Sequence, residues 1–387
     1  MKSIREAADL AVYGAPPAFP EIVHVGRPNL GERQALLDYV GQIYDRRWLS
    51  NHGPLVHELE ARIADMHGVK HCVAMCNGTI ALEIAIRALG LEGEVIIPSY
   101  TFVATAHALH WQAITPVFAD IDPATHNLDP DAVRRMITPR TTGIIGVHLW
   151  GRCAPVAALQ DVADEHGLQL MFDAAHAFGC RDRGHVVGGF GRCEVLSFHA
   201  TKVFNTFEGG AVVTNDDELA ETMKLMRNFG FKGFDNVIHP GTNGKMTEIS
   251  AAMGLVNLDA LPSFIASNKD RYDRYAAAFA GIAGVQLLRY DEADAPNYQY
   301  VVIEVDAARR DAVVDALHAE NILARKYFWP GCHGMKPYRE LFPHARLMLP
   351  HTEEVAARVI VLPTGETLPE GCIETVAAVC RTVLGSG

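Results

Sequence analysis

Short apolar segments alternate with amphipathic ones over much of this chain, from about Gly31 to Leu261. The apolar segments have no polar face, as is typical of strands that are covered on both sides of a sheet. The clearest predicted strands are Glu94–Ile97, Leu168–Phe172, Glu194–Leu196 and Ala211–Thr214. The segment Ile80–Leu89 has good helix propensity and is closed by Gly90. This alternation predicts an α/β fold with a wound, mostly parallel sheet.

The pattern changes near Leu261. Leu258–Ile265 is interpreted as a connection, and Ala266–Phe279 as a long helix that links two lobes. A second unit follows, with a predicted strand at Tyr298–Val305 and predicted helices at Arg309–Ala319, Thr352–Arg358 and Pro369–Leu384. We therefore predict an N-terminal segment at 1–30, a large domain at 31–261 and a smaller C-terminal α+β domain at 262–387.

The composition narrows the functional classes. The chain has 34 basic and 46 acidic residues and a formal charge of −12, whereas a nucleic-acid surface normally needs a basic stripe. No run reaches the ~18 uninterrupted apolar residues of a membrane span, and the first residues lack the apolar core of a signal peptide. The eight cysteines are scattered, without the paired spacing of a zinc site. We expect a cytoplasmic protein that binds no metal ion, nucleic acid or membrane.

Candidate chemistry centres on Lys202. It follows the predicted strand Glu194–Leu196 and lies among Ser, Thr and paired glycines in the segment Ser197–Gly210. Burying an ammonium costs several kcal/mol or lowers its pKa from about 10.4. A desolvated amine is also the nucleophile that forms a Schiff base with an aldehyde, including that of pyridoxal 5'-phosphate (PLP). A lone lysine in a loop is more often a surface residue, so the neighbouring motifs decide between the two interpretations.

Asp173 is the candidate partner of a PLP ring. It ends the predicted strand Leu168–Phe172, at the edge where open α/β sheets bind ligands. PLP chemistry needs a carboxylate against the pyridine nitrogen, which keeps the ring protonated. The alternative is that Asp173 caps a helix beginning in Ala174–Ala177. His176 could contact the ring or its phenolic oxygen, or it could be a packed polar residue.

A phosphate cradle is predicted at Cys76–Thr79, immediately before the helix Ile80–Leu89. Small and hydroxyl residues such as Gly78 and Thr79 leave backbone N–H groups free for an anion at a helix N-terminus, although such residues are also ordinary caps. Ser197 could add a hydroxyl from its strand end. Phe102 follows another predicted strand and could stack on a flat ring, or it could be a core residue.

Together these segments resemble the DegT/DnrJ/EryC1/StrS family of PLP-dependent sugar aminotransferases, which have the type I aminotransferase fold. The likeness runs from about Trp48 to the last helix. It rests on the order and spacing of several motifs: Trp48–Pro54, Cys76–Thr79, Pro98–Phe102, Val147–Gly151, Asp173–His176, Ser197–Gly210 and Gly241–Met246.

The resemblance implies a role for each candidate residue. Lys202 would carry PLP covalently, and Asp173 would hold the pyridinium nitrogen. His176 would meet the ring oxygen; many relatives have glutamine there, which leaves the exact contact open. The remaining implied contacts are stacking by Phe102, phosphate binding by Gly78, Thr79 and Ser197, and Asn243 arriving from the second subunit of a homodimer with shared active sites.

Within the family, the segments Phe198–Lys202, Phe207–Gly210, Val25–Asn29 and Tyr327–His333 resemble enzymes that aminate C4 of dTDP-4-keto-6-deoxy-D-glucose. This implies transfer of the amino group of L-glutamate to C4 of a nucleotide-linked 4-keto-6-deoxyhexose, giving dTDP-4-amino-4,6-dideoxyglucose. The candidates for contacts to the nucleotide sugar are His199, Arg325, Lys326 and Tyr327. The alternative for the last three is a strand that packs between lobes with its charges extended to solvent.

Other functions stay open at this stage. A C3 sugar aminotransferase and a PLP-dependent keto-sugar dehydratase would use the same cofactor, but the dehydratases of the family carry histidine in place of Lys202. A non-catalytic PLP-binding regulatory protein would not need the apparently complete acid–base set. A nicotinamide-dependent dehydrogenase is disfavoured, because Gly188–Gly191 follows no strand and opens no helix. The sequence leaves the regiochemistry, the stereochemistry, the nucleotide and the pathway undetermined.

Overall fold

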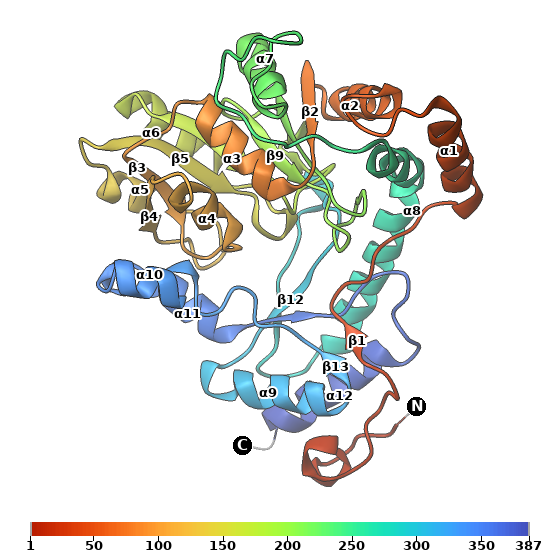
Figure 1. The fold of residues 1–387 in the computed structure, drawn as a ribbon. Coiled ribbons are helices and arrows are strands. Elements are labelled where there is room, and N and C mark those ends of the chain that lie inside the picture. Colours follow the sequence, from red (N-terminus) through yellow and green to blue (C-terminus); the bar gives the residue numbers. More distant parts are fainter. Residues whose placement is uncertain (1, 386–387) are drawn as a thin grey trace.

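The protein has two lobes in the computed structural model, which describes residues 2–385 (Figure 1). The large lobe contains a seven-stranded sheet in the order β2-β10-β9-β6-β5-β3-β4. Only β10 runs antiparallel to its neighbours, so the predicted α/β fold with a mostly parallel sheet is confirmed. The strands are β2 (His71–Met75), β3 (Glu94–Pro98), β4 (Thr115–Ala119), β5 (Thr141–Val147), β6 (Gln169–Asp173), β9 (Glu194–Ser197) and β10 (Gly210–Thr214).

Helices cover both faces of this sheet. Val73 of β2 and Ile145 of β5 pack under α3 (Gly78–Ala88), α4 (Ala104–His110) and α7 (Asp217–Met226). The adjacent residues of the same two strands face the opposite side of the sheet. Ala74 packs against α2 (Pro54–His67), and Ile144 packs against α5 (Pro130–Met136) and α6 (Val156–His166). Because both faces are covered, the carboxyl edge of the parallel strands is left to the loops that build a site.

The small lobe is a three-stranded antiparallel sheet of β11 (Gln286–Leu287), β12 (Val301–Glu304) and β14 (Val359–Leu362). Its helices are α9 (Ala307–Ala319), α11 (Pro350–Arg358) and α12 (Cys372–Gly385), whereas α10 (Lys336–Leu341) packs Tyr338 into the core of the large lobe. The N-terminal segment joins this lobe, because β1 (Val23–His24) pairs with β13 (Ile322–Leu323) and Leu10 enters its core. A short hairpin, β7 (Arg181–Asp182) and β8 (His185–Val186), completes the strands.

A single helix, α8 (Glu248–Phe279), connects the lobes, and α1 (Arg33–Arg46) packs against it. The prediction of a connection at Leu258–Ile265 is therefore wrong. Pro262, within that stretch, lies inside the helix, between the buried side chains of Leu261 and Phe264. The predicted domain boundary after residue 261 falls within α8.

The two halves of α8 belong to different cores. Ala251 and Leu255 pack in the large lobe, whereas Tyr275 and Phe279 pack in the small one. Within residues 2–385, α8 is the one helix whose length and hydropathy would suit a membrane span. Half of that stretch is buried inside the protein, as expected of a core helix.

Candidate active site

A cavity of about 550 Å³ lies at the carboxyl edge of the large sheet. We call it the cleft. Tyr300, Tyr327 and Phe328 line it from the C-terminal lobe. The cleft brings together nine of the predicted site residues: Gly78, Thr79, Phe102, Asp173, His176, Ser197, His199, Lys202 and Tyr327.

Lys202 lies in the connection between β9 and β10, and its amine reaches into the cleft. Burial lowers the pKa of this amine to about 8, and the opposite charge of Asp173 resists that shift. The nearest hydrogen-bonding group is the Tyr300 hydroxyl, 3.4 Å from Nζ. With a pKa of about 8, roughly a tenth of the amine is unprotonated at pH 7, a few hundred-fold more than for an ordinary lysine, and this is the form that attacks a carbonyl.

Asp173 ends β6 with both carboxylate oxygens fixed. Oδ2 accepts a hydrogen bond from the Thr105 hydroxyl at 2.9 Å, and Oδ1 accepts one from the Ala175 amide at 3.1 Å. Burial raises the pKa of this carboxyl, while the two donors and the Lys202 charge act in the opposite direction. No helix begins at Ala174–Ala177, so Asp173 stabilises a turn and caps no helix there. A buried carboxylate on the cleft wall suits a cationic ring nitrogen.

His176 is held as a neutral imidazole. Burial lowers its pKa well below the usual value, and the Lys202 charge adds to that effect. Nδ1 accepts a hydrogen bond from the Trp150 amide at 3.2 Å, which assigns the proton to Nε2. His176 can therefore donate one hydrogen bond toward an acceptor in the cleft.

The N-terminus of α3 forms the predicted cradle. The Asn77 side chain caps the helix by accepting from the Ile80 amide at 2.8 Å, which leaves the first amides of the helix directed at the cleft. A Cβ on Gly78 would lie 3.1 Å from Cβ of Ser197, and one on Gly210 would collide with the Gly78 amide nitrogen at 2.6 Å. The three segments thus meet closely enough to surround a phosphate with amides and the Ser197 hydroxyl.

The residues of this cleft fit PLP on the chemistry of their donors. An amine with a lowered pKa, a buried carboxylate, a neutral imidazole N–H and a helix N-terminus match the aldehyde, ring nitrogen, phenolic oxygen and phosphate of that molecule. Phe102 is 58% exposed at the cleft, which leaves its ring available for stacking. His199 is also exposed there, with Nε2 3.5 Å from a Glu208 oxygen.

Three predicted site residues lie outside the cleft. Arg325 lines a neighbouring cavity of about 190 Å³. Lys326 pairs with Asp311 at 3.1 Å and lies over the Trp329 ring, so it contacts neither cavity. Asn243 is exposed on the loop after α7 and does not line the cleft of its own chain.

Sequence reasoning missed two kinds of site residue. Tyr300 and Phe328 complete the wall, and Phe328 stacks on Trp150 with ring centroids 5.3 Å apart. Thr105 fixes Asp173 from α4. Aromatic residues just before a strand or in a turn, and a threonine in a helix, give no local signal of this role, because each becomes a site residue only through packing between distant segments.

The C-terminal wall is tied to the large lobe. Tyr100 donates a hydrogen bond to the carbonyl of Tyr327 at 2.5 Å. Ser99 Oγ is 2.7 Å from His333 Nδ1, and His333 Nε2 is 2.7 Å from Glu353. This network gives a structural reason for the motif Tyr327–His333, since it anchors the segment that closes the cleft.

The chain is similar to known sugar aminotransferases and transaminases. A dTDP-4-amino-4,6-dideoxy-D-glucose transaminase from Shigella dysenteriae is 36% identical over 364 residues, which cover 93% of this chain and 99% of the relative. The crystal structure of DesI in the presence of its TDP-sugar product has a TM-score of 0.92 and 50% identity, and the match covers 97% of this chain and 96% of DesI. The PLP form of Spr1654 from Streptococcus pneumoniae, described as a sugar aminotransferase, has a TM-score of 0.87 and 25% identity over 94% of this chain and 98% of its own.

The family model for DegT/DnrJ/EryC1/StrS aminotransferases matches residues 31–383. The match spans nearly the whole chain and includes every residue that lines the cleft. The likeness inferred from the motifs is thereby confirmed, and the chain belongs to the DegT/DnrJ/EryC1/StrS aminotransferase family.

Proposed function

We propose that this protein binds PLP and transfers the amino group of L-glutamate to C4 of a nucleotide-linked 4-keto-6-deoxyhexose. The observation that carries the proposal is that a lysine amine of lowered pKa and a buried carboxylate line the same cleft. The substrate class is supported by the name of the Shigella relative and by the TDP-sugar product of DesI.

Each residue would have a distinct part in the reaction. When bound, PLP carries the amino group between the two substrates and withdraws electrons from the carbon that loses a proton. The Lys202 amine takes that proton from the donor and returns it on the other side of the transfer. Asp173 keeps the ring nitrogen protonated, and His176 donates Nε2–H to the phenolic oxygen. Overall, L-glutamate and the 4-keto sugar give 2-oxoglutarate and the 4-amino sugar.

A place for the sugar diphosphate adjoins the cleft. The second cavity shares Thr201, Tyr300 and Tyr327 with the cleft and adds Arg325, whose guanidinium lies 5.1 Å from the Tyr327 ring centroid. Arg325 has no ion pair among residues 2–385, so its charge is available for a diphosphate. The geometry favours Arg325 over Lys326, whose charge already has the partner Asp311.

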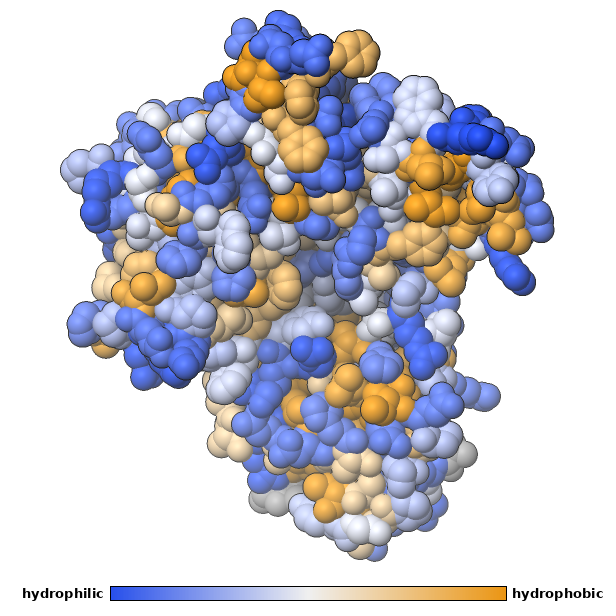
Figure 2. Space-filling model, in the orientation of Figure 1, coloured by the Kyte–Doolittle hydropathy of each residue, from blue (hydrophilic) through white to orange (hydrophobic). Residues whose placement is uncertain are grey.

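The enzyme is also proposed to work as a homodimer with shared active sites. Exposed apolar side chains gather on α1, on the following loop and on the loop after α7: Leu37, Val40, Tyr44, Trp48, Leu49, Phe229, Phe234, Val237 and Ile238. Figure 2 shows apolar surface over the α1–α2 corner. Apolar surface of this kind marks a protein interface more often than free surface. Asn243 lies on the same loop as Phe234, outside its own cleft, where it could reach a partner's phosphate.

Mixing two inactive variants tests the shared site. In a mixed dimer of Lys202→Ala and Asn243→Asp chains, one site carries both changes, and the other has an intact lysine and an intact asparagine. We expect activity to recover toward the statistical share of mixed dimers after subunit exchange. If proven exchange restores nothing, Asn243 acts within its own chain.

The proposed reaction is tested in reverse, with 2-oxoglutarate and two isomeric amino sugars on the same nucleotide. We expect the 4-amino-4,6-dideoxy sugar to be deaminated at least about ten-fold faster than the 3-amino isomer, as for a site that positions one carbon near Lys202. Repeating the assay with dTDP and GDP forms identifies the nucleotide. Preference for the 3-amino isomer would overturn the C4 assignment and leave the aminotransferase intact.

A further inference from the structure

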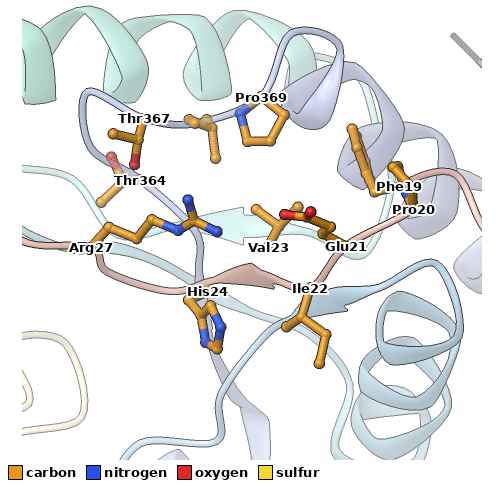
Figure 3. A pocket seen from close by; sticks show the side chains of 11 residues that line it. Phe19, Pro20, Glu21, Ile22, Val23, His24, Arg27, Thr364, Thr367 and Pro369 are labelled. Carbon is orange, nitrogen blue, oxygen red and sulfur yellow. The ribbon is translucent and has the colours of Figure 1, made fainter.

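A separate cavity of about 220 Å³ lies in the small lobe, between the N-terminal segment and the loop from Thr364 to Pro369 (Figure 3). It shares no residue with the cleft. One side of it is apolar and is formed by Phe19, Pro20, Val23, Leu368 and Pro369. Arg27 lines the cavity, and neither the fold nor the proposed transfer reaction gives its side chain a role.

The polar groups of this cavity lack partners. The residue Thr364 is only 8% exposed, and its buried hydroxyl makes no hydrogen bond. Arg27 is exposed, and its side chain makes no hydrogen bond or ion pair within the described part of the chain. An orphaned buried hydroxyl is costly, and native proteins rarely keep one without a reason.

The unpartnered groups converge. Figure 3 shows Thr364 and Thr367 at one end of the cavity and Glu21 at the other, with the Arg27 guanidinium reaching from the threonine end toward Glu21. His24 points away from the cavity, to the opposite side of β1. A planar guanidinium beside two hydroxyls suits an oxyanion, which it can bind through two parallel hydrogen bonds. The carboxylate of Glu21 disfavours a second anionic group at the far end.

We propose that this cavity binds a small organic molecule with one terminal carboxylate or phosphate and an apolar body. The oxyanion would contact Arg27 and the two threonine hydroxyls, and the apolar body would lie against Phe19, Leu368 and Pro369. The site is distinct from the cleft and does not depend on the transfer reaction. The two lie close along the chain, because Asn29, two residues after Arg27, donates to the carbonyl of Val203 at 3.0 Å, next to Lys202.

Calorimetry on the cofactor-loaded protein tests the site with matched probes. Phenylacetate supplies a carboxylate, phenyl phosphate supplies a phosphate, and benzyl alcohol lacks the charge. We expect one or both anions to bind, benzyl alcohol to bind at least ten-fold more weakly, and Arg27→Gln to weaken the anion at least ten-fold. Tighter binding of phenylacetate would identify the ligand as a carboxylate, and tighter binding of phenyl phosphate would identify it as a phosphate. Arg381→Gln, an exposed arginine of the same lobe, is the matched control and should leave binding unchanged.

Thr364→Val removes the orphaned hydroxyl at nearly constant volume. We expect it to weaken the bound anion several-fold without lowering the unfolding temperature of the probe-free protein, since no hydrogen bond is lost. Absence of binding by both anions would overturn the proposal. So would binding that Arg27→Gln leaves intact and Arg325→Gln abolishes, because the probe would then occupy the substrate cavity.

Discussion

Replacing Lys202 with alanine is expected to lower transamination by at least about 10⁴-fold, the scale of losses seen when a covalent nucleophile is removed. The physical reason is that no other amine lines the cleft among the described residues, so no group of suitable pKa replaces it. Steady-state rates with L-glutamate and the keto sugar measure the effect. Lys336→Ala, on the exposed surface of α10, is the matched control and should keep full activity.

The same position predicts a stability effect that separates lost chemistry from lost folding. The pKa of Lys202 is lowered by burial to about 8 in the folded protein, from an ordinary value of 10.5. The unfolded chain therefore binds the proton more tightly, and the stability of the cofactor-free protein rises as the pH increases between these two values. Lys202→Met should raise the unfolding temperature most below pH 8, and the gain should shrink toward pH 10.5. Full turnover by Lys202→Ala would contradict the assignment.

Asp173→Asn is expected to lower the rate by about 10²–10⁴-fold with the fold intact, a loss comparable to that of other preorganised charged groups. The amide oxygen can still accept from the Ala175 amide, and the amide nitrogen can donate to the Thr105 hydroxyl, which rotates to accept. The hydrogen bonds of the turn survive, and the negative charge that would hold a protonated ring nitrogen is lost.

A second measurement distinguishes this role from a purely structural one. The charge of Asp173 raises the pKa of Lys202, so its removal should move the Lys202 pKa below about 8. The pH dependence of chemical modification of Lys202 in the cofactor-free protein measures this shift. Thr105→Val keeps the charge and should cause a smaller loss of rate. A rate within tenfold of the wild type for Asp173→Asn would leave Asp173 as a turn residue only.

The sequence was informative where a functional side chain ends a strand. Asp173 and Ser197 are the last residues of β6 and β9, so the apolar runs before them predicted both positions and the edge at which they meet. Lys202 comes shortly after β9, and Gly78 is the first residue of α3. Their grouping could be inferred because parallel strands share one carboxyl edge.

Contacts between lobes were beyond this reasoning. Arg325 and Lys326 are adjacent, yet Arg325 lines the cavity beside the cleft, whereas Lys326 pairs with Asp311. Which neighbour faces a ligand depends on the packing of the segment against β14, for which the sequence offers no periodic pattern. The helix α8 was misjudged for a related reason, since the cost of an internal proline is offset there by tertiary burial.

The position of that proline has a mechanical consequence. A 32-residue helix whose ends are embedded in different cores acts as a stiff rod between the lobes. Pro262 has no N–H to donate, so the carbonyl of Leu258 lacks its helical partner, and the rod is weakest against bending at this turn. Any opening of the cleft that separates the lobes must therefore flex α8 near its middle, and the compliance of one turn of helix limits how far the two walls can part.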